Sequence, residues 1–190
     1  MRANYQYLAT YDVLTGLANR TKFFEELTLA IDRATRHGHM AGLIYIDLDG
    51  FKPINDHCGH EIGDRVLRNV TVRIIKTIRN IDTAARIGGD EFVVILEEIE
   101  NVEEAMMVGK KLCDAIAQPL TSLPQFSISA SIGIAIAPLH SNDATTLIKQ
   151  ADQAMYRAKR NKNSVVLFGL EPDQIDEENK IHSLHPSNRV

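Results

Sequence analysis

Helical spacing of apolar side chains marks four stretches of this chain. Apolar residues return every three or four positions, which predicts amphipathic helices over 19–36, 59–78, 101–117 and 143–160. Shorter apolar or alternating runs predict five strands, over 41–48, 83–87, 92–96, 125–137 and 165–168. Residues 49–56 contain Pro53, and we predict a loop there because proline interrupts a helix.

The order of these elements predicts the fold class. Along the chain they form a β-α-β-β-α-β series with additional elements. This is the ferredoxin-like split βαβ pattern, in which an antiparallel sheet is backed by helices. We therefore expect an α+β fold with an antiparallel central sheet and flanking helices. The composition becomes acidic and polar near the end of the chain, which predicts a tail or linker at 169–190.

A tight turn that carries two carboxylates joins the second and third predicted strands. Its sequence is Arg86-Ile-Gly-Gly-Asp-Glu-Phe92. Gly88 and Gly89 can adopt a positive φ and lack a Cβ, which suits a hairpin turn and lets a bulky ligand approach the backbone. Asp90 and Glu91 follow directly, and their oxygens are suitable ligands for a divalent cation. The four residues alone are equally compatible with an ordinary solvated turn.

Another carboxylate lies at the end of the first predicted strand. Residues 41–48 are apolar on both faces until Asp47, as expected for a buried central strand. In a β-α-β-β arrangement this strand lies beside the hairpin, so we expect Asp47 and Asp90 to lie near one another. Two adjacent carboxylates repel each other unless a cation lies between them. Oxygen ligands without a cysteine or a histidine pair favour Mg²⁺ or Mn²⁺ over zinc, and Mg²⁺ with few protein ligands normally also binds substrate phosphates. A nucleoside triphosphate is therefore the expected substrate.

Composition and charge narrow the class of protein further. A chain of 190 residues with 44% hydrophobic residues is long enough for one domain with a substantial core. A net charge of −4 argues against a protein that coats nucleic acid. Two cysteines, Cys58 and Cys113, are too few for a disulfide framework and fit a reducing compartment. No apolar run reaches about 18 residues, so we expect a cytoplasmic domain without a membrane segment, although a parent protein anchored in a membrane remains compatible with this sequence.

The turn and its flanks resemble the GGDEF family of bacterial diguanylate cyclases, whose name is the string Gly88-Gly-Asp-Glu-Phe92. The resemblance begins at Asp12-Val-Leu-Thr-Gly-Leu-Ala-Asn-Arg20 and extends to about Phe168. It implies a palm-like core and a cyclase domain at 12–168. It also implies a missing N-terminal input domain, with 1–11 as the end of an upstream linker or signalling helix. For Asp12 and Arg20 we favour an internal salt bridge or a cap over a direct catalytic role.

Metal ligands and catalytic residues are implied by the same resemblance. It assigns the metal ion, Mg²⁺ or Mn²⁺, to Asp47, the carbonyl of Leu48, Asp90 and Glu91. Lys52 corresponds to a lysine that steadies phosphate charge in the transition state. Asp90 would also accept the proton of the attacking 3′-hydroxyl, helped by the cation. The catalytic set implied in this way is Asp90, Lys52 and Glu91.

The resemblance also implies a set of nucleotide-binding residues: Asn55, His60, Asp64, Gly88, Gly89, Lys159 and Lys162. Asp64 is the residue expected to recognise guanine, because a carboxylate can accept from N1–H and N2–H of guanine together and adenine does not offer that pair. Its simpler interpretation is an exposed helix residue. Lys159 matches a lysine that contacts the terminal phosphates. The segment after it is one residue shorter than in the family and has Lys162 where arginine is expected, and lysine supplies charge but not a bidentate fork.

A product site is implied by Arg79-Asn-Ile-Asp82, which matches the Arg-x-x-Asp motif of the family. Arginine suits both phosphate and the Hoogsteen edge of guanine, and aspartate suits its Watson–Crick edge. The alternative is a salt bridge at a helix end. If the motif binds product at Arg79 and Asp82, the enzyme should be inhibited by its own product.

The implied reaction is attack of the 3′-hydroxyl of one GTP on the α-phosphorus of another, performed twice to give cyclic di-GMP and two pyrophosphates. Each subunit would hold one GTP, so two domains must meet about a two-fold axis and a monomer should be inactive. Two alternatives stay open. One is a non-catalytic module that binds GTP or cyclic di-GMP and signals through a partner; the other is a cyclase or polymerase-like enzyme of different specificity. Loss of acidic residues from the turn would favour the first alternative, and none is lost.

Overall fold

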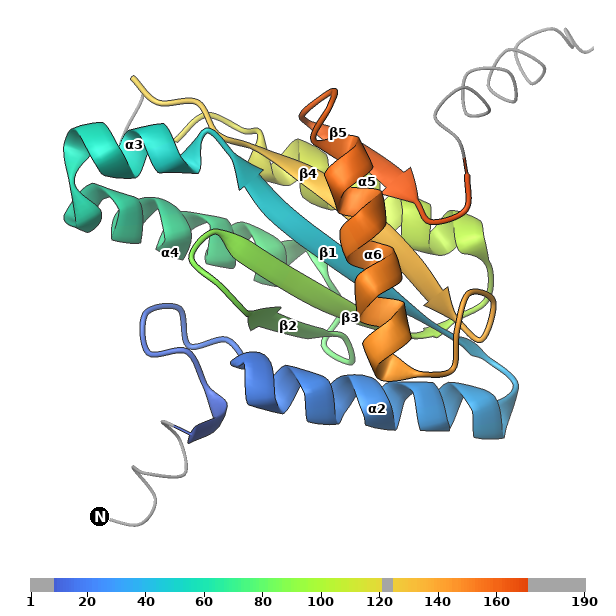
Figure 1. Ribbon diagram of the computed structural model, residues 1–190. Helices are drawn as coiled ribbons and strands as arrows, with labels where there is room; N and C mark the ends of the chain where they lie inside the picture. Colours follow the sequence, from blue (N-terminus) through green and yellow to red (C-terminus); the bar gives the residue numbers. More distant parts are fainter. Residues whose placement is uncertain (1–8, 121–124, 171–190) are drawn as a thin grey trace, which may run out of the picture.

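One five-stranded sheet lies between two layers of helices in the structure (Figure 1), a computed structural model that describes residues 9–120 and 125–170. The strand order across the sheet is β2-β3-β1-β4-β5. Residues 1–8 of the predicted linker and 171–190 of the predicted tail lie outside the described residues. The elements in chain order are α2 (Arg20–His37), β1 (Met40–Asp49), α3 (Phe51–Cys58), α4 (His60–Thr77), β2 (Thr83–Arg86), β3 (Glu91–Ile99), α5 (Val102–Ile116), β4 (Ser129–Ala137), α6 (Ala144–Ala158) and β5 (Ser164–Leu167).

Strand β1 occupies the centre of the sheet and pairs antiparallel with both of its neighbours, β3 and β4. The hairpin strand β2 pairs antiparallel with β3. The predicted antiparallel core and the β-α-β-β-α-β order are therefore confirmed. Strand β5 pairs in parallel with β4, which makes the complete sheet mixed. This pairing follows from the connection through α6, because parallel neighbours cannot be joined by a tight turn.

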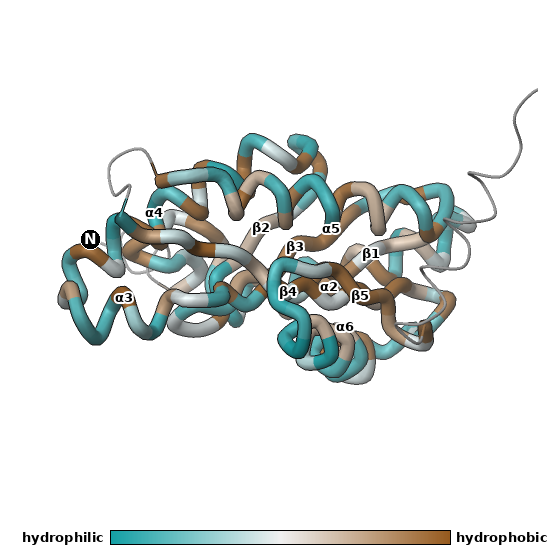
Figure 2. The backbone as a smooth tube through the Cα atoms, turned by 90° about the horizontal axis from the view of Figure 1, so that it is seen from above, coloured by the Kyte–Doolittle hydropathy of each residue, from teal (hydrophilic) through white to brown (hydrophobic). Residues whose placement is uncertain are grey.

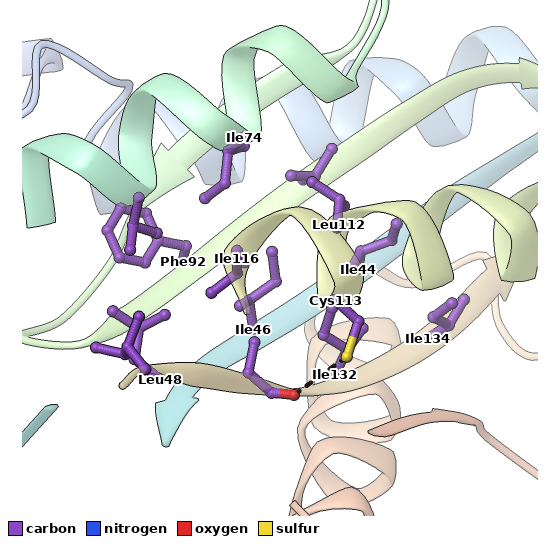
Figure 3. Packing of buried hydrophobic residues seen from close by; sticks show 14 of the residues in the cluster. Ile44, Ile46, Leu48, Ile74, Phe92, Leu112, Cys113, Ile116, Ile132 and Ile134 are labelled. Atoms are coloured by element: carbon purple, nitrogen blue, oxygen red, sulfur yellow. Dashed lines mark hydrogen bonds between the residues drawn. The ribbon is translucent and has the colours of Figure 1, made fainter. Parts of the chain in front are cut away.

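Different helices cover the two faces of the sheet, because successive side chains of a strand point to opposite faces. Ile44 and Ile46 of β1 belong to the cluster formed with α4 and α5. Figure 3 shows Ile44 beside Leu112 and Ile46 beside Ile116, both residues of α5. Tyr45 belongs to the other cluster, formed with α2 and α6. Figure 2 shows the resulting layers, with hydrophobic strands between helices whose outer surfaces are hydrophilic.

Capping residues explain where most of the helices begin. The side chains of Asn19, Asn101 and Asp143 each accept a hydrogen bond from a backbone N–H in the first turn of α2, α5 and α6. Such caps satisfy donors that have no partner within the helix. Gly38 ends α2 with a φ of 72°, a conformation in which glycine is favoured. Within the described part of the chain, no helix is both long and apolar enough to cross a membrane.

The prediction of a loop at 49–56 is wrong, since residues Phe51–Cys58 form the helix α3. Pro53 is the third residue of this helix. The N–H groups of the first turn have no acceptor within a helix, so a proline there removes no hydrogen bond. Gly59, with a φ of 84°, then separates α3 from α4. Lys52 and Asn55 therefore lie on a regular helix rather than on a loop.

The predicted strand over 125–137 is too long at its beginning. Strand β4 starts at Ser129, and residues 125–128 precede it without strand pairing. Ile128 is nevertheless buried in the main cluster. The alternating pattern therefore indicated burial correctly at this position, but hydrogen bonding to β1 begins only opposite Asp49.

A β-bulge interrupts β3 at Glu98. Met40 pairs with Ile99 and Gly42 with Leu96, so β3 contains one extra residue in this interval. Glu98 has a φ of 52°. We expect Glu98→Gly to raise the free energy of unfolding by about 0.5 kcal/mol, because relief of about 1–2 kcal/mol of strain exceeds the added entropy cost of about 0.5–1 kcal/mol. Equilibrium unfolding in urea measures this difference.

Glu100→Gly is the matched control for this bulge. Glu100 is also exposed, but it is not among the described residues with a positive φ. Glycine at position 100 should therefore lower stability. An equal loss in both variants would show that the backbone at Glu98 carries no strain.

Candidate functional site

The ends of β1 and β3 form a pocket of about 290 Å³, here named the strand-end pocket. Asp47 lies directly opposite Glu91 in the β1–β3 pairing, and the N–H of Leu48 donates to the carbonyl of Asp90 at 3.2 Å. The structure thus brings Asp47 and Asp90 to one pocket, as the strand order led us to expect. The residues that line it are Asp47, Leu48, Asp49, Gly50, Lys52, Pro53, Asp90, Lys159 and Lys162.

Asp47 is a buried carboxylate with a lysine partner. Its residue is 6% exposed, and Lys159 Nζ lies 2.8 Å from its Oδ2. Burial raises the pKa of Asp47, the hydrogen bond and charge of Lys159 oppose that rise, and the neighbouring carboxylates of Asp90 and Glu91 add to it. Burial lowers the pKa of Lys159, but Asp47 together with Asp90 and Asp49 outweighs this effect, so that the pKa is raised overall. The pocket therefore stabilises a positive charge beside Asp47.

A divalent cation fits this donor set, but the protein offers it few side-chain ligands. Among residues 9–120 and 125–170 no group of three or more His, Cys, Asp or Glu side chains is placed to hold a metal ion. Two carboxylates, Asp47 and Asp90, and the backbone carbonyl of Leu48 could contribute, which leaves several positions for water or phosphate. Mg²⁺ is commonly bound by one or two carboxylates together with substrate oxygens. The residues are thus compatible with a metal bound together with a nucleotide.

Glu91 is directed toward the turn and toward Tyr45. The Tyr45 hydroxyl donates to Glu91 Oε1 at 3.3 Å, and burial followed by the charge of Glu91 raises the pKa of Tyr45. A Cβ on Gly88 would lie 2.5 Å from Glu91 Oε2, so a larger residue at position 88 would push the end of this flexible side chain aside. Neither Gly88 nor Gly89 has the positive φ that was considered for the turn. The small size of Gly88 therefore lets the Glu91 carboxylate keep its contact with Tyr45.

Arg86 links the turn to the segment that precedes α2. Its guanidinium contacts both carboxylate oxygens of Asp12 at 3.2 Å and donates to the carbonyl of Gly89 at 2.9 Å. Asp12 also accepts from the N–H and the hydroxyl of Thr15. The simpler interpretation of Asp12 as a member of an internal salt bridge is thus confirmed, and the residue that it caps belongs to a turn and not to a helix. Arg20 is the first residue of α2.

Helices α3 and α4 carry the residues proposed for the nucleotide. Lys52 lines the strand-end pocket. Asn55 packs against Gly63 of α4, where a Cβ would overlap with Asn55 Oδ1. Asp64 follows Gly63 and is partly buried, whereas His60 is an exposed residue in the first turn of α4. The contact at Gly63 therefore brings Asn55 beside the part of α4 that carries Asp64.

Two features of the pocket were not predicted as such from the sequence. Lys159 and Lys162 both line it, but the ion pair of Lys159 with Asp47 was not foreseen. Asp49 also lines it and had no predicted role. A signal for Asp49 was present, because residues two apart on a strand point to the same face. Asp47-Leu-Asp49 therefore places two carboxylates on one side of β1.

Arg79 and Asp82 lie together as an internal ion pair. The Arg79 guanidinium donates to Asp82 and Glu104 at 3.1 Å and to the Glu97 carbonyl at 2.7 Å. The Asp82 side chain is 1% exposed. This is the helix-end salt bridge that the sequence left open as the alternative to a product site. A neighbouring pocket of about 370 Å³ is lined in part by Ile75, Arg79 and Asp82.

Comparison with known proteins gives evidence independent of this geometry. The family model described as diguanylate cyclase, GGDEF domain, matches residues 9–164. The diguanylate cyclase TpbB of Pseudomonas aeruginosa is 37% identical over 188 residues, which cover 97% of this chain and 43% of TpbB. MucR of the same species, a bifunctional diguanylate cyclase/cyclic di-GMP phosphodiesterase, is 42% identical over 163 residues, covering 85% of this chain and 24% of MucR. The chain thus spans less than half the length of these relatives.

Solved structures share the fold over most of the described residues. The GGDEF domain of TpbB superposes with a TM-score of 0.78 at 37% identity and covers 82% of this chain and 98% of that domain. The coiled coil and GGDEF domain of DgcB from Caulobacter crescentus, solved in complex with c-di-GMP, has a TM-score of 0.78 at 31% identity, covering 87% of this chain and 89% of that one. The α+β palm-like architecture is common to all of them.

Proposed function

The chain belongs to the GGDEF domain family of diguanylate cyclases, and from this premise we propose that it condenses two GTP molecules into cyclic di-GMP and two pyrophosphates. The observation that carries the proposal is the strand-end pocket. There Asp47 and Asp90 lie together with three lysines, Lys52, Lys159 and Lys162. Two carboxylates can share a metal ion, and the surrounding ammonium groups can bind phosphate oxygens. The pocket is therefore suited to a metal-bound triphosphate.

The side chains of the pocket have distinct roles in this proposal. Asp47, Asp90 and the Leu48 carbonyl would hold Mg²⁺ or Mn²⁺, with Glu91 beside them. The metal ion, when bound, neutralises phosphate charge and lowers the pKa of the attacking hydroxyl. Asp90 accepts the proton of the 3′-hydroxyl. Lys52, Lys159 and Lys162 orient the phosphates and balance their charge, so that catalysis consists largely of positioning and electrostatic stabilisation.

Guanine recognition is assigned to the α3–α4 pair. Asp64 would accept from N1–H and N2–H of guanine, and the amide of Asn55 would bind the same base. The contact of Asn55 with Gly63 supports this assignment, since it holds the amide next to the Asp64 turn of α4. His60, at the exposed start of α4, would contact the nucleotide from the same side. Gly88 and Gly89 would admit the ligand close to the backbone of the turn.

Two copies of the domain are required for this reaction. Each domain offers one strand-end pocket, whereas the product contains two nucleotides joined by two phosphodiester bonds. We propose that two domains face each other about a two-fold axis, each with one GTP. Because the relatives are longer than this chain, we propose that an additional input domain controls the pairing of the two GGDEF domains. Two free cysteines, one of them buried, support a cytoplasmic location, because free thiols persist in a reducing compartment.

Incubation of the concentrated domain with Mg²⁺ and either GTP or ATP tests the proposed function. We expect cyclic di-GMP and pyrophosphate from GTP and no cyclic dinucleotide from ATP. The reaction velocity should rise with the square of the enzyme concentration while most of the domain is monomeric. Tight GTP binding without turnover at any concentration would favour the alternative, a non-catalytic module that signals through a partner.

Product inhibition through Arg79 and Asp82 is a further part of the proposal. The complex of DgcB with c-di-GMP supports it, because that domain has the same fold. In the structure Arg79 is occupied by Asp82, Glu104 and the Glu97 carbonyl. Cyclic di-GMP would therefore have to replace these partners with its phosphates and guanine edges. Of the two acidic partners, Glu104 is more accessible than Asp82, because its side chain is 26% exposed.

We expect Arg79→Ala to leave the initial rate of turnover within about twofold of the unmodified domain and to raise the inhibitory product concentration at least about tenfold, which corresponds to loss of one charge-assisted contact. Initial-rate inhibition curves with added cyclic di-GMP measure this. Arg36→Ala is the control, since Arg36 is an exposed cation on α2. Unchanged inhibition in Arg79→Ala would remove the product site from the proposal.

A further inference from the structure

The Asp49 carboxylate is engaged by three donors from other elements. Oδ1 accepts from the Ser131 hydroxyl at 2.8 Å, and Oδ2 accepts from the Ser129 hydroxyl and from the backbone N–H of Asn163, both at 3.1 Å. A carboxylate offers about four lone-pair positions. Asp49 therefore has little capacity left for a metal ion or a substrate, although it lines the strand-end pocket. These contacts identify it as an anchor.

The segment that Asp49 holds is the turn after α6, residues 159–163. The Ala158 carbonyl closes this turn by accepting from the N–H groups of Asn161 and Lys162, both at 3.1 Å. Lys162 and Asn163 then have φ values of 50° and 42°. Residues with a Cβ rarely adopt this left-handed conformation, and two in succession persist only where surrounding contacts fix them.

Asn163 is fixed from two sides. Its N–H is bound by Asp49, and its Oδ1 accepts from the thiol of Cys113 in α5 at 3.3 Å. The turn is therefore tied both to the end of the central strand and to a helix on the opposite face of the sheet. Lys159 and Lys162, which line the strand-end pocket, lie at the beginning of the turn and directly before Asn163.

We propose that Asp49 is a positioning residue that fixes the turn 159–163 through Asn163, so that the ammonium groups of Lys159 and Lys162 face the pocket and receive the polyphosphate of the substrate. The inference rests on the proposed function, because it assigns a polyphosphate to this pocket. It adds a residue that does not touch the nucleotide. The two carboxylates of Asp47-Leu-Asp49 then have different roles, since Asp47 pairs with Lys159 in the pocket and Asp49 shapes the site.

The sign of the effect separates positioning from charge. Removal of a carboxylate near a bound polyanion should strengthen binding if Asp49 acts through its charge alone. If Asp49 positions the lysines, its removal should weaken binding, because two cations lose their fixed placement. The measured change in affinity therefore has opposite signs under the two roles.

The experiment measures binding of inorganic tripolyphosphate with Mg²⁺ by calorimetry, and of guanosine by NMR titration, to the intact domain. We expect Asp49→Ala to bind tripolyphosphate about tenfold more weakly and guanosine with unchanged affinity. Hydrogen exchange of the Asn163 amide should become faster in the same variant. Asp32→Ala, which removes an exposed carboxylate from α2, should change none of these values. Tripolyphosphate affinity equal to or higher than that of the unmodified domain in folded Asp49→Ala overturns the proposal.

Two further variants keep the test decisive. Asp49→Asn preserves the shape of the side chain with a single acceptor oxygen, and we expect a smaller loss of tripolyphosphate affinity; if Asp49→Ala does not fold, no loss in Asp49→Asn overturns the proposal. Asn163→Gly retains the N–H that Asp49 binds and fits the positive φ, so its tripolyphosphate affinity should stay within about twofold of the unmodified domain. These measurements need no cyclic di-GMP synthesis, so a domain that binds tripolyphosphate through this anchor but makes no product would refute the proposed function alone.

Discussion

Asp90→Ala should lower the rate of cyclic di-GMP formation by at least about a thousandfold, because it removes the proposed metal ligand and the proposed proton acceptor in one change. Asp90 and Asp47 share the strand-end pocket. The other described carboxylates near it are engaged, because Glu91 accepts from Tyr45 and Asp49 accepts from three donors. Asp90→Asn should be nearly as inactive, because an amide neither accepts the proton nor balances the cation. Single-turnover assays with GTP at saturating concentration measure the chemical step.

The fold should survive the loss of the Asp90 carboxylate. The structural contact of Asp90 is its backbone carbonyl, which accepts from the N–H of Leu48. Thermal unfolding should therefore change little in both Asp90 variants. Residual activity above about a tenth of the original in Asp90→Asn would contradict the assignment, since loss of a general base alone costs about 10²–10⁴-fold. Asp32→Ala serves again as the control for removal of an exposed carboxylate.

Gly133→Ala should have the largest effect on stability, about 3–5 kcal/mol, because overpacking against a backbone cannot be relieved by a side-chain rotation. Gly133 lies in β4 where α6 crosses the sheet. A Cβ at this position would come closer than 3.0 Å to the Ala151 carbonyl and to the Met155 backbone nitrogen. The helix must therefore move away from the sheet. Because a domain is stable by only about 5–15 kcal/mol, urea unfolding should show a large decrease in midpoint.

Gly38→Ala is the matched control for Gly133→Ala. Gly38 has a φ of 72° and no atom within 4 Å of a Cβ built on it. Alanine at position 38 should cost only about 1–2 kcal/mol, from the left-handed backbone conformation. Equal losses in the two variants would mean that α6 can shift over β4 at little cost. Lys159 would then not be held rigidly, since it directly follows α6.

Hydrophobic spacing was sufficient to predict the architecture, because burial on a helix or a strand produces a clear period. The four long helices, the hairpin and the buried central strand all follow from that pattern. The wrong loop prediction at 49–56 rested on Pro53 and not on this spacing, since the position of a proline within a helix decides whether it is tolerated. Hydrophobic spacing could not reveal the bulge at Glu98 or the late start of β4 at Ser129, since these depend on hydrogen-bond register between distant strands.

The candidate site was predictable where its residues adjoin recognisable motifs. Asp47 and Asp90 were expected to converge from the strand order alone, and they line one pocket. The ion pair between Lys159 and Asp47 joins segments more than a hundred residues apart, so no local pattern reports it. Asp49 was missed for a related reason. Its three donors come from β4 and from the turn after α6, and only the folded chain brings them together.

The central place of β1 has a consequence for synthesis of the protein. Both strands that pair with β1 follow it along the chain, and the second of them ends at Ala137. During translation, this apolar segment is synthesised before either of its hydrogen-bonding partners, and β4 follows it only after about 80 residues. Nascent chains with unpaired apolar strands are prone to aggregation. We therefore expect the growing polypeptide to depend on chaperones until β4 has emerged, and codon changes that slow elongation between β1 and β4 to lower the yield of native protein.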